Sequence, residues 1–201
     1  MTDTNIELNN TIYQRMKKII TLFVLSIAFG STLLAQGKYF TRDGNISFFS
    51  ETPVEDIEAH NKKATCVLDD ETGTLEFAVL IKSFEFEKAL MEEHFNENYM
   101  ESNEYPKATF KGKILDYAGV RDSGFPPGVE LKAQGTMMIH GVEKEITTTG
   151  YVTRDGENMQ LKSSFVVKPE DYNIEIPNTV RDNIAKEIAV NVDAELKPLK
   201  K

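Results

Sequence analysis

Residues 86–112 read FEKALMEEHFNENYMESNEYPKATFKG, a stretch whose pattern joins a short helix to an extended strand. Phe86, Ala89 and Leu90 share one helical face while the glutamates lie largely off it, which predicts a short amphipathic helix. Pro106 bars further helix before the extended ATFKGK run begins. The stretch therefore predicts a helical crossover that ends at a strand.

Outside this crossover the dominant period of the sequence is two. Leu75, Phe77 and Val79 alternate with more polar neighbours, as expected for a strand that buries one face. Alternation of this kind, together with shorter apolar runs, predicts about eight strands. These strands are expected at residues 46–50, 57–68, 75–82, 108–117, 131–139, 146–152, 159–167 and 187–196.

The connections between these strands favour hairpins. Asp155-Gly156 is a dipeptide typical of type I′ turns, and His140-Gly141 separates two alternating runs. Two connections are long, namely the helical crossover at residues 83–106 and the loop around residues 124–128. Neighbouring strands should therefore be antiparallel, and periodicity alone leaves a sandwich and a closed barrel as alternatives.

Several short segments resemble the YceI-like family of secreted, lipocalin-like proteins that bind polyisoprenoids and other lipids. They are YPKATFKG at residues 105–112, MIHGVEKEI at 138–146, FVV at 165–167, DYNI at 171–174 and AKEI at 185–188. The resemblance implies an all-β fold, a lipocalin-like antiparallel β-barrel of about eight strands with a short helical crossover. It also implies an apolar ligand in the barrel, of the polyisoprenoid or isoprenoid quinone type.

Residues 1–35 are interpreted as a signal peptide. The basic run Met16-Lys17-Lys18 precedes an apolar stretch at residues 19–29, and Ala35 offers a cleavage point. The apolar stretch is about 11 residues long, whereas a membrane-spanning helix needs about 20. Residues 1–15 are an expected over-long start, and residues 37–201 are the expected YceI-like domain. This arrangement predicts a secreted protein, periplasmic in a Gram-negative bacterium.

Composition excludes some partners. The chain carries 32 acidic and 23 basic residues, a net charge of −9, which disfavours nucleic acids and anionic membrane surfaces. Lysines at outward strand positions, such as Lys111 and Lys162, argue against stable membrane insertion. Cys66 is the only cysteine, so no intrachain disulfide can form, and its thiol is expected to pack as a small apolar group.

Catalytic patterns are missing from the sequence. It contains no G-x-S-x-G, no phosphate-binding Gly-Lys-Ser/Thr loop and no H-E-x-x-H. His60, His94 and His140 fall on different predicted elements, and Glu92-Glu93-His94 fits the solvated face of a helix better than a metal site. We therefore predict a protein that is not an enzyme, with no catalytic residue, no metal ligand and no cofactor.

The predicted function is to bind or carry a long apolar ligand outside the cytoplasm. The alternatives are a structural or protein-interaction barrel with a filled core and, less favoured, a cofactor-dependent enzyme. A homodimer is left open. Nine side chains of shared parity are the candidate cavity lining, namely Phe48, Phe77, Val79, Ile81, Phe110, Ile114, Met137, Ile139 and Phe165.

Two segments beside the barrel carry open alternatives. The aromatic and apolar residues of the crossover could cover the barrel mouth as a lid or fill one end of the core. They are Phe84, Phe86, Leu90, Phe95, Tyr99 and Tyr105. Residues 168–183, with two prolines and several acids, are read as a loop beside the last strand that could border the ligand entrance.

Overall fold

The computed structural model describes residues 37–199, and the expected signal peptide at residues 1–35 lies outside them. The strands of the described part are β1 (Lys38–Glu51), β2 (Asp56–Asp69), β3 (Thr74–Leu80), β4 (Glu85–Phe86), β5 (Lys107–Ile114), β6 (Glu130–Ile139), β7 (Val142–Asp155), β8 (Asn158–Val167) and β9 (Ile188–Pro198). Its helical segments are η1 (Ile81–Ser83), α2 (Ala89–His94), the π-helical turn η2 (Phe95–Tyr99), α3 (Tyr117–Asp122), η3 (Pro169–Tyr172) and η4 (Asn178–Asn183).

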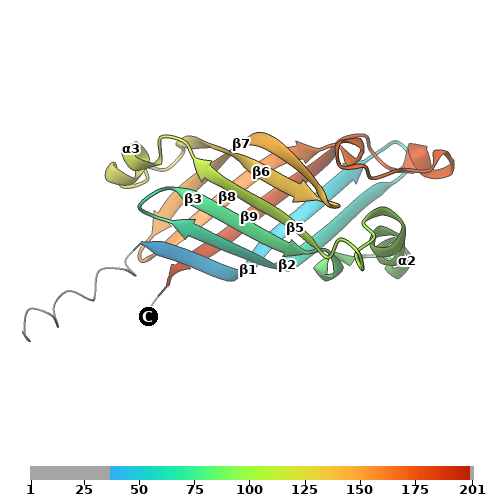
Figure 1. The fold of residues 1–201 in the computed structure, drawn as a ribbon, viewed down its shortest axis with the longest axis horizontal. Coiled ribbons are helices and arrows are strands. Elements are labelled where there is room, and N and C mark those ends of the chain that lie inside the picture. The colour runs from blue at the N-terminus through green and yellow to red at the C-terminus, as the bar shows by residue number, and fades with distance from the viewer. Residues whose placement is uncertain (1–36, 200–201) are drawn as a thin grey trace, which may run out of the picture. The chain divides into compact units, whose positions relative to one another are not determined.

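Eight of these strands form a closed antiparallel barrel. The sheet order is β1-β9-β8-β7-β6-β5-β3-β2, and β1 also pairs with β2, which closes the ring. The short strand β4 adds to the other edge of β2 through the pair Ala59↔Phe86. Figure 1 shows the tilted strands with α3 at one end of the barrel and α2 at the other. The lipocalin-like barrel with a helical crossover is thus confirmed.

Tight turns set the registers of two hairpins. His140 and Gly141 adopt φ values of 51° and 72° between β6 and β7, and the pair Ile139↔Val142 follows directly from that two-residue turn. Gly156, at φ 60°, plays the same part between β7 and β8, where Asp155 pairs with Asn158. These registers place residues of one parity on the inner face of both strand pairs.

Three local predictions were wrong. The strand expected at residues 75–82 ends at Leu80, because Ile81 begins the short helix η1. The strand expected to reach Tyr117 ends at Ile114, because Asp116 takes a left-handed conformation (φ 54°) and α3 begins immediately afterwards. Tyr117 is buried, and its hydroxyl donates a hydrogen bond of 2.6 Å to Asp70 Oδ1. In the crossover, Phe86 belongs to β4 rather than to the helix. Pairing with β2 overrides the helical pattern at Phe86.

The α3 end of the barrel is filled with side chains. Tyr117 and Phe125 pack with ring centroids 5.6 Å apart, and the guanidinium of Arg154 lies over the rings of both Tyr39 and Phe125. Three large, fully buried side chains at this end lie on β2, β8 and β9. They are Leu68, Met159 and Leu196. None of these side chains borders the cavity described below, so the core occupies one end of the barrel and leaves the other hollow.

Candidate binding cavity

The hollow end holds a cavity of about 560 Å³. That volume lies in the range of roughly 300–1,000 Å³ typical of small-molecule sites. Its walls come from all eight barrel strands, with β2 contributing only Ile57, and from segments near α2 and η4. Figure 1 places α2 and the orange-red segment with η3 and η4 at the same end of the barrel. The cavity mouth therefore lies among connections rather than in the filled end.

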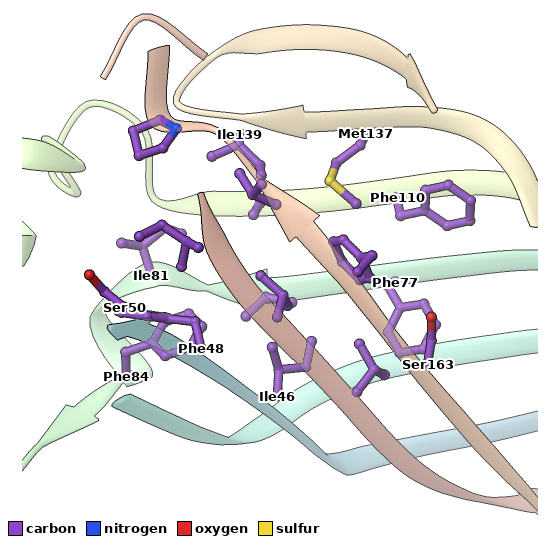
Figure 2. A pocket seen from close by; sticks show the side chains of 18 of the residues that line it. Ile46, Phe48, Ser50, Phe77, Ile81, Phe84, Phe110, Met137, Ile139 and Ser163 are labelled. Atoms are coloured by element: carbon purple, nitrogen blue, oxygen red, sulfur yellow. The ribbon is translucent and has the colours of Figure 1, made fainter. Parts of the chain in front are cut away.

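All nine side chains singled out in the sequence border this cavity. Five are buried, namely Val79, Ile81, Phe110, Ile114 and Met137, and the other four are partly buried. Strand pairing brings distant residues together, because Phe77 pairs with Phe110 and Phe110 pairs with Met137. Figure 2 shows these three side chains on neighbouring strands and Ile139 and Ile81 toward the opposite side of the view. Their role as ligand contacts is a proposal taken up below.

An aromatic cluster walls the mouth end of the cavity. The rings of Phe48, Phe84, Phe86 and Phe95 lie with centroids 5.1–5.7 Å apart. Three of these rings come from the crossover, and all four border the cavity without filling it. Tyr105 lies elsewhere, with its ring centroid 4.5 Å from that of His140.

The segment after β8 contributes a wall that the sequence analysis did not specify. Ile174, Ile176 and Val180, within residues 168–183, and Ile184, directly after them, border the cavity. The sequence predicts this stretch only as a loop beside the entrance. The signal was present in the sequence, because these four are the large aliphatic residues of a stretch otherwise rich in acids and prolines. Apolar residues in such a loop indicate contact with a core.

Polar contacts hold this segment against the β6–β7 hairpin. Lys144 Nζ lies 2.8 Å from Asp171 Oδ1, and His140 Nδ1 lies 3.2 Å from the carbonyl oxygen of Tyr172. The other ring nitrogen of His140 lies 2.9 Å from Glu101 Oε2, at the end of the crossover. His140 therefore joins both connections that border the mouth, and it does so from outside the cavity lining.

A second polar group spans the mouth itself. Lys88 Nζ donates to Glu55 Oε1 at 2.9 Å, and Asn183 Nδ2 donates to Glu55 Oε2 at 3.3 Å. These three residues, here called the mouth latch, come from the β1–β2 turn, the start of α2 and η4. The hydrogen bond from Lys88, followed by the one from Asn183, lowers the pKa of Glu55, and the same contact raises the pKa of Lys88. The latch therefore keeps its charges across the neutral range.

The remaining candidate groups for chemistry do not converge. His60 is exposed beside Glu58, at 3.2 Å, and His94 is exposed on α2 at the mouth. Cys66 is fully buried, and burial raises the pKa of its thiol. Within residues 37–199, no three His, Cys, Asp or Glu side chains gather in a way that could hold a metal ion. No helix in the same range is both long and apolar enough to cross a membrane.

Comparison with protein families assigns the chain over most of its length. The model of the YceI-like domain matches residues 35–196. The chain belongs to the YceI-like family. No curated protein matches it in sequence. The short segments quoted above, from YPKATFKG to AKEI, all fall inside the matched range, so the resemblance drawn from them is confirmed.

Solved structures show the same fold at low sequence identity. A polyisoprenoid binding domain from Saccharophagus degradans, implicated in plant cell wall breakdown, matches with a TM-score of 0.67 and 16% identity, over 81% of this chain and 98% of that one. BcnA from Burkholderia cenocepacia matches with a TM-score of 0.62 and 17% identity, over 76% and 95%. The YceI protein of Campylobacter jejuni gives a TM-score of 0.54 and 18% identity, over 68% and 82%.

Proposed function

We propose that this YceI-like protein binds a long apolar ligand of the polyisoprenoid or isoprenoid quinone type in its barrel. The observation that carries the proposal is the cavity of about 560 Å³ with a predominantly apolar lining, kept open inside an otherwise close-packed barrel. Each buried CH₂ group contributes roughly 0.8 kcal/mol, so a long chain gains affinity without specific hydrogen bonds. The Saccharophagus relative, described as a polyisoprenoid binding domain, supports the same ligand class.

The nine predicted side chains are proposed as ligand contacts. They border the cavity on β1, β3, β5, β6 and β8 and on η1, and none carries a charge or a hydroxyl. Such a lining suits an unbranched or methyl-branched chain and offers little to a polar metabolite. The family and its neighbours favour a binding protein over an enzyme, and the hollow barrel end speaks against the alternative of a filled core.

Export from the cytoplasm is a second part of the proposal. It rests on the basic run, short apolar stretch and Ala35 of residues 1–35. N-terminal sequencing of protein from its native host should find a chain that begins near Gln36, in the periplasm of a Gram-negative bacterium. Cytoplasmic protein that begins at Met1 or Met16 would contradict it.

Identification of the bound lipid is the experiment that tests binding. Native protein should release an isoprenoid lipid on extraction with organic solvent, in near-stoichiometric amount by mass spectrometry. Ile139→Trp places a larger ring in the cavity and should lower this amount, whereas Val166→Trp, on the outer face of β8 where Val166 is 55% exposed, should not. Equal lipid content in both variants, or no lipid in folded wild-type protein, would overturn the proposal.

A further inference from the structure

The backbone pairing between β7 and β8 stops part-way along the two strands, inside the barrel wall. Their pairing runs from Asp155↔Asn158 to Gly150↔Ser163 and goes no further, although β7 extends back to Val142 and β8 extends on to Val167. Beyond this point β7 pairs only with β6, and β8 pairs only with β9. Two side-chain hydroxyls occupy the inner wall at the point of separation, those of Thr148 and Ser163.

The two hydroxyls use their hydrogen-bonding capacity unequally. Ser163 Oγ donates to the carbonyl oxygen of Thr149 at 2.6 Å. Thr148 Oγ1 lies 3.4 Å from Ser163 Oγ and 3.5 Å from the Thr149 carbonyl oxygen. Both distances are long against the 2.7–2.8 Å usual for hydroxyl donors. Thr148 can therefore form a shorter bond to a group that enters the cavity.

The surroundings of the hydroxyl pair are apolar. Across the strands, Thr148 faces Ala133 and Ser163 faces Val192. Gly150, two residues after Thr148 on β7, pairs directly with Ser163, and a Cβ there would lie 2.5 Å from the Lys162 carbonyl oxygen, so this position adds no side chain to the wall. In Figure 2, Ser163 lies across the view from Ser50, with labelled apolar side chains between. The hydroxyls of Thr148 and Ser163 are therefore two polar groups in an otherwise apolar part of the cavity wall.

The charges around the cavity argue against an anionic ligand at this point. Of the lysines that border it, Lys88 is paired with Glu55, and Lys162 is paired with Asp193 at 3.1 Å and lies 60% exposed. Lys132 is exposed and lies on the outer face opposite Thr149. A phosphate buried beside the two hydroxyls would lack a counter-ion, which costs several kcal/mol. An uncharged group with an oxygen atom meets no such penalty.

We propose that Thr148 and Ser163 anchor the uncharged, oxygen-bearing end of the ligand, an alcohol or a carbonyl, while its apolar chain extends toward the mouth. Thr148 donates to the ligand oxygen, and Ser163 holds the Thr149 carbonyl and orients the pair. This inference rests on the proposed function, because it assigns one end of the same apolar ligand. It makes Thr148 and Ser163 determinants of ligand class and orientation.

A matched ligand series with one tail tests the inference. Farnesene, farnesol and farnesyl diphosphate share an isoprenoid tail and differ at one end, which is a hydrocarbon diene, an alcohol and a diphosphate respectively. Each can be tested for displacement of the fluorescent apolar probe N-phenyl-1-naphthylamine from the purified protein. Farnesol should compete about 3- to 10-fold better than farnesene, since one neutral hydrogen bond contributes roughly 0.5–1.5 kcal/mol. Farnesyl diphosphate should compete least well of the three.

Two double variants test whether the hydroxyls of Thr148 and Ser163 cause the preference for farnesol over farnesene. In Thr148→Val/Ser163→Ala the advantage of farnesol over farnesene should fall below about twofold. Thr147→Val/Ser164→Ala makes the same substitutions at exposed positions of the same strands and should keep the advantage. Circular dichroism checks that each variant is folded, and the wild-type comparison of farnesol with farnesene needs no variant.

Each contrary result has a distinct meaning. Equal competition by farnesol and farnesene in the wild type, or an advantage that survives in Thr148→Val/Ser163→Ala, would overturn the anchor while leaving lipid binding intact. Tightest binding of the diphosphate would also overturn it and move the polar end to a cationic position. Failure of all three ligands on folded protein would overturn the proposed function together with the anchor.

Discussion

Gly135 is the residue at which the barrel wall has least room. It pairs with Gly112 on β5, and a Cβ at Gly135 would lie 2.2 Å from the Lys111 carbonyl oxygen and 2.3 Å from Gly112 Cα. Gly135→Ala should lower the free energy of unfolding by about 1–3 kcal/mol or more, because backbone atoms must move apart. The measurement is urea denaturation, with Gly119→Ala as the control.

Gly119 is a fitting control because a Cβ there meets nothing within 4 Å, and the residue lies in the helix α3. Replacing a helical glycine by alanine stabilises by up to about 1 kcal/mol. Gly119→Ala should therefore be neutral or slightly stabilising. Similar losses of stability in both variants would show that the close approach of β5 and β6 is not the cause.

Cys66 gives a prediction about reactivity. The thiol is fully buried on β2, and burial raises its pKa, so the thiolate form needed for attack is scarce at pH 8. Native protein should fail to react with 5,5′-dithiobis(2-nitrobenzoate) at that pH, and the unfolded protein should release one equivalent of thionitrobenzoate. Rapid reaction of the native protein would place the thiol at the surface or in a readily opened segment.

At the scale of elements, the sequence carries more information about strands than about connections. Strands were predictable because alternating burial repeats over many residues, as along Leu131 to Ile139 of β6. The helix α3 was not predicted. It begins soon after β5 ends, and the change depends on the left-handed conformation of Asp116 and on the burial of Tyr117. Short segments depend on such tertiary contacts, and local periodicity does not record them.

The mouth latch connects three segments of the chain, and exchanging the charges of Glu55 and Lys88 tests its role. Lys88→Glu places a second carboxylate beside Glu55 and should speed release of N-phenyl-1-naphthylamine from the cavity. The double exchange Glu55→Lys/Lys88→Glu should restore slow release, because it again places opposite charges at these two positions. Stopped-flow dilution measures the release rate, with Lys62→Glu, an exposed change on β2, as the control.

The pH dependence of the latch has a definite sign. Since the folded-state pKa of Glu55 is lowered, its contribution is present above the ordinary carboxyl pKa and is lost as pH falls through the lowered value. The raised pKa of Lys88 keeps its contribution up to strongly alkaline pH. Probe release should therefore stay slow across the neutral range and quicken in acid, below about pH 4. The same acid response in Glu55→Gln would rule the latch out as its origin.

At the scale of the whole molecule, the barrel has a packed core at one end and a cavity at the other, and parity alone does not show this division. Met159 and Phe165 share the inner face of β8, yet Met159 is fully buried in the filled end and Phe165 borders the cavity. Both residues follow the same alternation along β8. The surroundings of Met159 and Phe165 differ because the rings of Tyr117 and Phe125 pack into the filled end of the barrel. Both rings belong to the segment after β5, and strand alternation does not predict how that segment packs.

Three lysine substitutions along β8 test this division directly. Val166→Lys lies on the outer face, where the wild-type side chain is 55% exposed, and should change neither stability nor lipid content. Phe165→Lys borders the cavity and is partly exposed, so its ammonium can reach toward solvent at the mouth; the protein should fold but lose its lipid. Met159→Lys buries an unpaired charge at a position with no exposure, which costs several kcal/mol, so the protein should unfold.

Circular dichroism and mass spectrometry of extracted lipid separate the three outcomes. A folded Met159→Lys protein without lipid would mean that the cavity reaches into the α3 end, because only a hollow there would accept the charge.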